Sequence, residues 1–339
     1  MRKILVIQTA SIGDVILATA LLEKLHRFYP DASIDILIKN GMESLFEGHP
    51  FIHRLLIWDK SIKYGSFYRL LREVRSEQYD LVINIQRFTM TGILTALSGG
   101  KTTIGFDKNP LSRFFSNRIP HEIGQGIHET QRNQKLIAEL TDGKAEKPKL
   151  YIEGMPDAGY RVPDKNDEIY QSGIRHQASG IYYTVSPASL WFTKQFPAER
   201  WAELIREMPA GAAVYLLGSA SDFNLCEEIK NEGRRTIVNL AGQLTLLESA
   251  ALMQGAKMNF TNDSAPMHLA SAVNAPVTVV YCSTMPEFGF GPLSNNSAIV
   301  EVQEQLSCRP CGLHGRNSCP EGHFKCAVDI DLKLLRSRF

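Results

Sequence analysis

An aspartate stands just after the first apolar run of the chain, where a carboxylate can serve as a base. Lys3–Gln8 is predicted to form a buried strand, and Asp14 follows Gly13 at the start of a helical pattern over Asp14–Tyr29. A carboxylate at this place can take a proton from a hydroxyl group. Aspartate is also a common cap of helix N-termini, so a purely structural role for Asp14 stays open. Gly13 would allow a tight turn or the close approach of a ligand.

A loop with hydroxyl groups and one lysine follows a second predicted strand, over Ile181–Val185. Ser189, Leu190 and Lys194 lie in this loop, and a helix is predicted to begin at Pro197. Hydroxyl groups, a cation and the free N–H groups of a helix start together suit a diphosphate. The loop lacks the glycines of a Walker motif, so it is not a P-loop. A surface turn with an incidental lysine is the alternative.

A third polar segment again joins the end of a strand to the start of a helix. Asp263 or Ser264 is expected to cap that helix, and His268 lies one turn inside it. The free N–H groups there suit a phosphate, and Asp263 would orient Lys194 or a ribose hydroxyl. A lone helix histidine is more often structural, so the role of His268 stays open. Asp222, after another predicted strand, is a weaker candidate for binding ribose hydroxyls.

Short β-branched runs alternate with helical patterns along the chain, and these elements must position the polar segments. Strands are predicted over Lys3–Gln8, Ser33–Ile38, Leu55–Trp58, Leu81–Ile85, Thr102–Gly105, Ile181–Val185, Val214–Leu217, Thr236–Val238, Lys257–Phe260 and Val277–Tyr281. Helices are predicted over Asp14–Tyr29, Phe67–Ser76, Ala198–Glu207, Asp222–Asn231, Leu246–Gln254 and Pro266–Ala272. Two such series predict an α/β protein with two open parallel sheets, each covered by helices and facing a shared cleft. Such sheets bind ligands beyond the carboxyl ends of their strands, where the polar segments lie.

The chain is long enough for two domains, and the pattern lapses between the two series. We expect a first domain over residues 1–160, a linker over 161–178, a second domain over 179–326 and a C-terminal helix over 327–339. The chain is 44% hydrophobic and 22% charged, which supports two cores and no disorder, while its net charge of +1 excludes no partner by itself. Because neither a signal peptide nor a membrane-spanning run is visible, we expect a cytoplasmic protein.

Two further segments have open interpretations. Cys308, Cys311, Cys319 and Cys326 could bind a structural zinc ion, but the second pair is spaced too widely for a standard zinc ribbon, so reduced thiols remain the alternative. Cys226 and Cys282 stand alone and are expected in the cores. Residues 107–118 mix cations with aromatic side chains, which suits contact with a membrane surface or with a phosphorylated acceptor. An ordinary solvated loop is the alternative.

Taken together, these segments resemble the ADP-heptose:lipopolysaccharide heptosyltransferases, glycosyltransferase family 9. The motifs are Gly13-Asp14, KQFPAERW over residues 194–201, and Asp263-Ser264 with His268. HETQRN over 128–133 resembles the family's segment ahead of the last helix of the first domain, and Pro286 with Gly291-Pro292 resembles its loop after the last strand. Each motif is weak alone, but their order and spacing are specific, and the resemblance runs from residue 1 to about 330. The cysteine-containing stretch is most similar to the subgroup that adds the second inner-core heptose.

The resemblance implies two Rossmann-like domains in the GT-B arrangement, with the acceptor on the first and ADP-heptose on the second. It implies an inverting, metal-independent transfer of heptose to a hydroxyl of the lipopolysaccharide inner core, without a cofactor or a nucleic-acid partner, in the cytoplasm or at the inner face of the inner membrane. Asp14 would be the general base. The donor-binding residues would be Ser189, Leu190 (through its backbone), Lys194, Asp222, Asp263, Ser264 and His268, and the acceptor-binding residues Gly13, Lys60, Lys63, Arg113 and Arg118.

One position departs from the family pattern. Members commonly have glycine after the Asp-Ser or Asp-Thr pair, where this chain has Ala265. If that position required a positive φ, alanine would be strained and the donor loop would differ locally. Transfer of another nucleotide sugar, another acceptor, and a catalytically silent nucleotide-sugar-binding protein are the alternatives. A dehydrogenase is disfavoured because the glycine fingerprint of dinucleotide-binding folds is absent.

Overall fold

The structure is a computed structural model that describes residues 2–61, 65–124, 126–152, 180–233 and 236–339. The chain divides into two compact units, Met1–Tyr151 and Ile152–Phe339. The linker predicted over residues 161–178 lies outside the described residues, as does Lys63.

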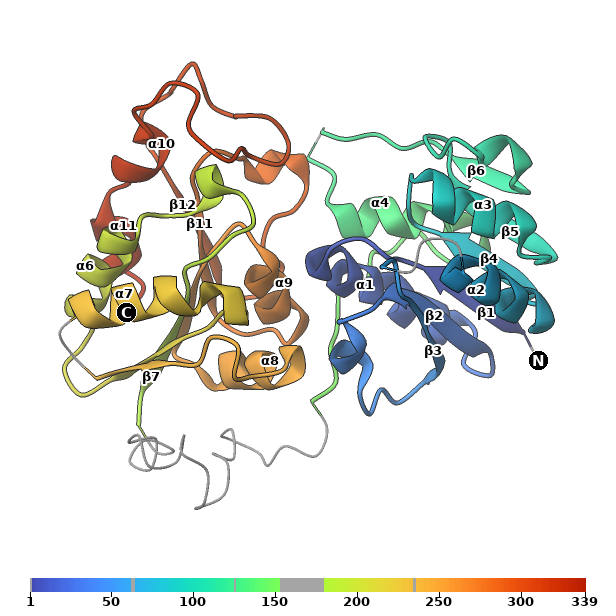
Figure 1. Ribbon diagram of the computed structural model, residues 1–339, viewed down its shortest axis with the longest axis horizontal. Coiled ribbons are helices and arrows are strands. Elements are labelled where there is room, and N and C mark those ends of the chain that lie inside the picture. Colours follow the sequence, from blue (N-terminus) through green and yellow to red (C-terminus); the bar gives the residue numbers. More distant parts are fainter. Residues whose placement is uncertain (1, 62–64, 125, 153–179, 234–235) are drawn as a thin grey trace. The chain divides into compact units, whose positions relative to one another are not determined.

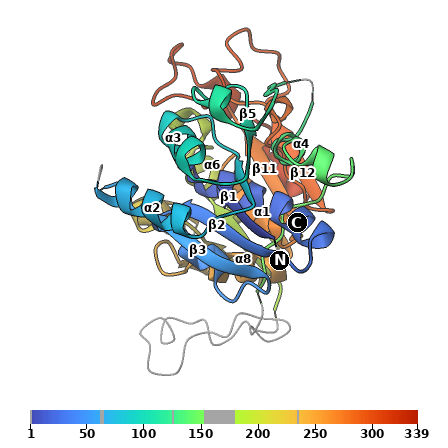
Figure 2. The same cartoon turned by 90° about the vertical axis from the view of Figure 1, so that its right-hand side faces the viewer.

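The first unit is built on a six-stranded parallel sheet with the order β3-β2-β1-β4-β5-β6. Its strands are β1 Lys3–Ile7, β2 Ser33–Lys39, β3 Ile52–Trp58, β4 Leu81–Asn84, β5 Thr102–Phe106 and β6 Asn117–Ile119. Its helices are α1 Ile12–Phe28, α2 Gly65–Ser76, α3 Thr89–Leu97 and α4 Glu129–Lys135, with short 3₁₀ helices η1 Glu43–Phe46, η2 Ser112–Phe114 and η3 Ala138–Leu140. Helices α1 and α4 cover one face of the sheet, and α2 and α3 cover the other (Figures 1 and 2).

The second unit repeats this plan with the strand order β12-β11-β10-β7-β8-β9. Its strands are β7 Tyr182–Ser186, β8 Ala213–Leu216, β9 Ile237–Asn239, β10 Met258–Asn262, β11 Val277–Tyr281 and β12 Ser297–Glu301. Its helices are α6 Ala198–Arg206, α7 Phe223–Gly233, α8 Leu246–Gly255, α9 Ala265–Ala272, α10 Lys325–Val328 and α11 Leu332–Arg336, with η5 Phe192–Lys194, η6 Ala220–Asp222 and η7 Pro286–Phe288. Helices α6 and α7 pack together on one face of the sheet, and α8 and α9 on the other (Figure 1).

The central strands of both sheets are apolar because each sheet is covered on both faces. Strands β1, β4, β10 and β11 are buried along almost their whole length, and Cys226 and Cys282 lie in the second core as predicted. The prediction of an α/β protein with two parallel sheets is thus confirmed. Within the described residues, no helix is long and apolar enough to cross a membrane.

Strands β6 and β12, helices α3 and α4, and the short 3₁₀ helices were not predicted from the sequence. Strands β6 and β12 lie at sheet edges and have exposed positions, so they lack the continuous apolar run of a central strand. The HETQRN motif, expected ahead of a helix, itself forms α4, with His128 as its N-cap. The segment with Pro286 and Gly291, expected after the last strand, lies between β11 and β12.

Candidate functional site

Asp14 lies in a capping box at the start of α1, directly beyond the carboxyl end of β1. Ser11 is the N-cap residue, so the expectation that Asp14 itself occupies the cap position was wrong. The Asp14 Oδ2 atom accepts the Ser11 backbone N–H at 3.1 Å and the Ser11 hydroxyl at 2.6 Å. No hydrogen bond to the other carboxylate oxygen, Oδ1, occurs among the described residues, so the structural and the chemical role can coexist on one side chain. Gly13 is the second residue of α1 and has no positive φ, so it does not form the tight turn that was considered.

Lys60 reaches the same loop from the end of β3. Its Nζ donates to the carbonyl oxygen of Thr9 at 2.7 Å and lies 5.0 Å from the ring centre of Trp58. Burial, together with the positive charge of Lys39, lowers the Lys60 pKa. The Thr9 hydroxyl and the Gln86 side-chain amide form a hydrogen bond of 2.8 Å. The structure therefore brings Lys60, which was predicted to bind the acceptor substrate, to the loop that carries Asp14.

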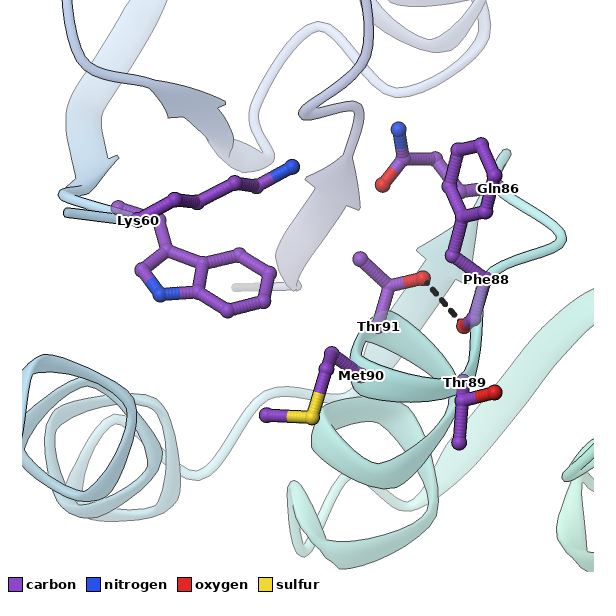
Figure 3. Close-up of a pocket in the computed structure, with 7 residues that line it drawn as sticks. Lys60, Gln86, Phe88, Thr89, Met90 and Thr91 are labelled. Atoms are coloured by element: carbon purple, nitrogen blue, oxygen red, sulfur yellow. Dashed lines mark hydrogen bonds between the residues drawn. The ribbon is translucent and has the colours of Figure 1, made fainter. Parts of the chain in front are cut away.

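A pocket of about 490 Å³ opens beside these residues. It is lined by Trp58, Lys60, Gln86, Phe88, Thr89, Met90 and Thr91. Figure 3 shows Lys60 and Gln86 reaching into the same space from the loops that follow β3 and β4, with Met90 and Thr91 of α3 below them. The pocket thus combines one cation and an amide with apolar walls, a composition suited to a sugar that bears an anionic group.

A second carboxylate, Glu129 of α4, lies in the electrostatic environment of Asp14. Arg132 donates from its Nε and Nη2 atoms to Glu129 Oε2 at 2.9 and 2.6 Å. Burial raises the pKa of Glu129, and the Asp14 carboxylate raises it further, while Arg132 and Arg87 lower it. The HETQRN motif signalled this region, but nothing in its sequence linked Glu129 to Asp14.

Arg113 and Arg118 lie near the edge of this sheet formed by β6, whereas Lys60 follows β3 at the opposite edge. Arg118 is in the edge strand β6, and Arg113 in η2 holds its guanidinium 4.7 Å from the ring centre of Phe114. Both arginines are exposed, and Phe114 is 56% exposed. No contact between these arginines and the Asp14 loop occurs in the described part of the chain.

In the second unit, the loop between β7 and α6 is fixed by Asn262 at the end of β10. The Asn262 side chain donates to the carbonyl oxygen of Pro187 at 2.6 Å and accepts the Phe196 N–H at 3.0 Å. Gln195 closes the loop by donating to the carbonyl oxygen of Ser189 at 2.6 Å. Leu190 is 88% exposed, so its side chain lies outside the core, and the role of its backbone stays a prediction. No motif or periodic pattern singles out Asn262.

Lys194 and Asp263 form an ion pair beyond the carboxyl ends of β7 and β10. Lys194 Nζ lies 2.6 Å from Asp263 Oδ2, and the side chains are 15% and 9% exposed. The Thr284 hydroxyl donates to the same carboxylate oxygen at 2.6 Å. The predicted orientation of Lys194 by Asp263 is therefore present, and it leaves a fixed cation next to the start of α9.

The other residues predicted to bind the donor include Ser264, His268 and Asp222. Ser264 is the N-cap residue of α9, and His268 is buried one turn later. Ala265 is the first residue of α9 and has no positive φ, so the departure from glycine causes no backbone strain. Asp222 accepts the Ser219 N–H at 2.7 Å in a capping box at the end of β8, and no contact with Lys194 is found among the described residues.

The cysteine-rich segment, residues 308–326, holds four free thiols. Within the described residues, no group of three or more His, Cys, Asp or Glu side chains is arranged to hold a metal ion. Cys308 Sγ lies 3.9 Å from His323 Nε2. Burial raises the pKa of Cys326 to about 12, so this thiol stays protonated at neutral pH.

Comparison with known proteins gives a consistent family. The model of glycosyltransferase family 9 (heptosyltransferase) matches residues 67–317. Lipopolysaccharide heptosyltransferase 3 of Escherichia coli is 27% identical over 84% of this chain and 84% of its own length. Lipooligosaccharide heptosyltransferase 2 of Haemophilus influenzae is 27% identical over 89% of both chains. The structure of E. coli ADP-heptose lps heptosyltransferase II superposes with a TM-score of 0.76 at 21% identity, covering 99% of this chain and 97% of that one.

Proposed function

This chain belongs to glycosyltransferase family 9, and we propose that it transfers heptose from ADP-heptose to a hydroxyl of the lipopolysaccharide inner core, with inversion and without a metal ion. The observation that carries this proposal is the Lys194–Asp263 ion pair at the start of α9, in a chain of this family. A fixed cation beside free helix N–H groups is suited to a departing diphosphate.

The second unit binds the donor in this proposal. Lys194 and the first N–H groups of α9 neutralise the diphosphate, and Ser189 and the Leu190 backbone contact it from the loop. His268 and Ser264 lie on the same helix start, and Asp222 takes the ribose hydroxyls. Because these groups stabilise the charge that ADP carries away, no divalent ion is needed for the leaving group.

The first unit binds the acceptor. The hydroxyl oxygen of the acceptor attacks the anomeric carbon of the heptose from the face opposite ADP, through an oxocarbenium-like transition state. Asp14 takes the hydroxyl proton through Oδ1, while Oδ2 keeps its bonds to Ser11. As the new C–O bond forms, the bond to the diphosphate oxygen breaks and its electrons leave with ADP. A single displacement of this kind inverts the configuration.

The acceptor is held by Lys60 and by the pocket beside it, with Gly13 giving the acceptor close access to α1. Lys63, Arg113 and Arg118 add positive charge for anionic groups further along the acceptor. The exposed pair of Arg113 and Phe114 also supports peripheral contact with the inner face of the inner membrane, from the cytoplasm. Co-sedimentation with anionic vesicles tests this contact, which Arg113→Ala with Phe114→Ala should weaken.

Calorimetry with ADP tests the donor site. Lys194→Ala should weaken ADP binding by about 1.5–3 kcal/mol, roughly 10–150-fold, because a charge-assisted phosphate contact is lost. Lys194→Gln, which keeps a hydrogen-bond donor for Asp263 without the charge, separates charge loss from disorder of the loop. Lys230→Ala, in a half-buried ion pair with Glu227 on α7, is the matched control and should change nothing. Undiminished ADP binding by both Lys194 variants would refute the site.

A catalytically silent nucleotide-sugar-binding protein is the second candidate. It predicts the same calorimetry but no acceptor-dependent release of ADP. The carboxylate of Asp14, on the loop that Lys60 contacts through the Thr9 carbonyl oxygen, favours the enzyme.

A further inference from the structure

The cysteine-rich segment packs directly against the strand end that supports the donor site. The Arg309 guanidinium donates to the carbonyl oxygens of Cys282 at 2.7 Å and Thr284 at 2.8 Å. The Cys311 N–H donates to the carbonyl oxygen of Ser283 at 2.9 Å. Thr284 in turn donates to Asp263, the partner of Lys194. On this side the segment is thus connected to the proposed phosphate-binding cation, Lys194, through two hydrogen bonds and the Asp263–Lys194 ion pair.

Thr193 joins this segment to the donor loop from the other side. Its N–H donates to the carbonyl oxygen of Arg316 at 3.0 Å, and its hydroxyl oxygen accepts the Arg316 N–H at 2.8 Å. The Ser283 hydroxyl donates to the same Thr193 oxygen at 2.9 Å, and the Ser283 N–H donates to the Thr193 carbonyl oxygen at 3.2 Å. Thr193 is 1% exposed and directly precedes Lys194. Four hydrogen bonds therefore fix the backbone from which the Lys194 side chain extends.

Gly315 allows the segment to touch the lysine itself. Its φ of +80° is in the region that favours glycine. A Cβ at this position would lie 3.0 Å from Lys194 Cγ, 3.1 Å from Thr193 Oγ1 and 3.2 Å from Trp191 Cβ. Glycine thus lets the backbone of the segment form one wall against the stem of Lys194.

We propose that residues 309–316 are a brace of the donor site, and that Gly315 and Thr193 are positioning residues for Lys194. The inference rests on the proposed function, because it assumes that Lys194 binds the diphosphate. A lysine loses much conformational freedom when its ammonium is fixed on a ligand. The brace confines the stem and Asp263 holds the ammonium, so less freedom is left to lose when ADP binds.

The test is Gly315→Ala, with Gly322→Ala as the matched control. Gly322 lies in the same cysteine-rich segment with a φ of +71°, but a Cβ there meets no atom within 4 Å. Both variants put alanine in a left-handed conformation, and only Gly315→Ala pushes on Lys194. By calorimetry, Gly315→Ala should bind ADP roughly tenfold more weakly, the effect of losing part of a charge-assisted contact, while Gly322→Ala binds like the wild type.

A double-mutant cycle decides whether the effect passes through Lys194. In a Lys194→Ala background, Gly315→Ala should cause no further loss of ADP affinity. Equal losses in both backgrounds, or equal losses for the two glycine variants, would overturn the brace. If Lys194→Ala weakens ADP binding and Gly315→Ala does not, the brace fails and the donor site stands. If Lys194→Ala itself has no effect, the donor site fails and the brace fails with it.

Thr193 gives a second route if Gly315→Ala does not fold. Thr193→Val removes the hydroxyl that bonds Ser283 and Arg316, and it should weaken ADP binding. Thr193→Ser keeps the hydroxyl and should restore it. Weak binding by both Thr193 variants, or wild-type binding by both, would contradict the proposed role of the hydroxyl.

Discussion

Asp14→Asn separates the two roles that the structure gives to Asp14. Both hydrogen bonds that the Asp14 side chain accepts from Ser11 use one carboxylate oxygen, Oδ2, and an asparagine oxygen can accept the same N–H and hydroxyl. The substitution removes only the ability to take a proton. We therefore expect unfolding and ADP binding to stay near those of the wild type, while catalysis is lost.

The magnitudes of the two effects differ enough to be distinguished. A positioned general base contributes about 10²–10⁴-fold to the rate, which corresponds to about 3–5 kcal/mol of activation free energy. A helix cap contributes only about 1 kcal/mol to stability. Ser11→Ala is the matched variant, because it breaks the capping box and leaves the Asp14 carboxylate in place. It should lose about 1 kcal/mol of stability and keep most of its turnover.

The assay follows acceptor-dependent ADP release for wild type, Asp14→Asn and Ser11→Ala, beside thermal unfolding of each. We expect the activity loss in Asp14→Asn and the stability loss in Ser11→Ala. An Asp14→Asn variant that is both active and stable would end the assignment of Asp14 as the base. It would leave Asp14 as a capping residue only.

Two further predictions concern the expected independence from metal ions and the half-buried His49. Excess chelator should change neither turnover nor melting temperature, and elemental analysis should find no bound metal at the cysteine-rich segment; activity that is lost with chelator and restored by a divalent ion would contradict this. Burial lowers the pKa of His49 from 6.5 to about 4, with His26 and Lys149 adding to the effect, so the first unit should lose stability as the pH falls from 6.5 toward 4, by at most about 3 kcal/mol. His49→Phe should reduce this loss of stability at low pH, whereas the control His314→Phe, at an exposed position, should not. An unchanged pH profile of His49→Phe would show that His49 does not cause the loss.

Much of the fold could be predicted because parallel strands covered on both faces are written as continuous apolar runs. Strands such as β1 and β11 follow this pattern, and their positions agreed with the prediction to within about a residue. Helix α3 was missed because its sequence, TMTGILTAL, carries threonines and a glycine that weaken local helical preference. Its helical state is set by packing on the sheet, which a local pattern does not contain.

The candidate site could be predicted in part, for the same reason. Lys194 and Asp263 each follow a strand of one parallel sheet, so the topology alone brings them to one edge. Asn262 and Thr193 act through hydrogen bonds to residues far away in the sequence, and no periodic pattern announces such bonds. Gly315 was equally hidden, because its importance comes from a contact across more than a hundred residues with Lys194.

The central claim, heptosyl transfer from ADP-heptose, is tested most directly by mass spectrometry of the reaction products. The purified protein is incubated with ADP-heptose and a panel of inner-core acceptors in chelator, with ADP-glucose as the competing donor and Asp14→Asn as the inactive control. We expect one acceptor to gain the mass of a single heptose with equimolar release of ADP, and NMR of that product to show an anomeric configuration opposite to that of the donor. Binding of ADP-heptose without any glycosylated product across the panel, or faster transfer from ADP-glucose, would contradict it.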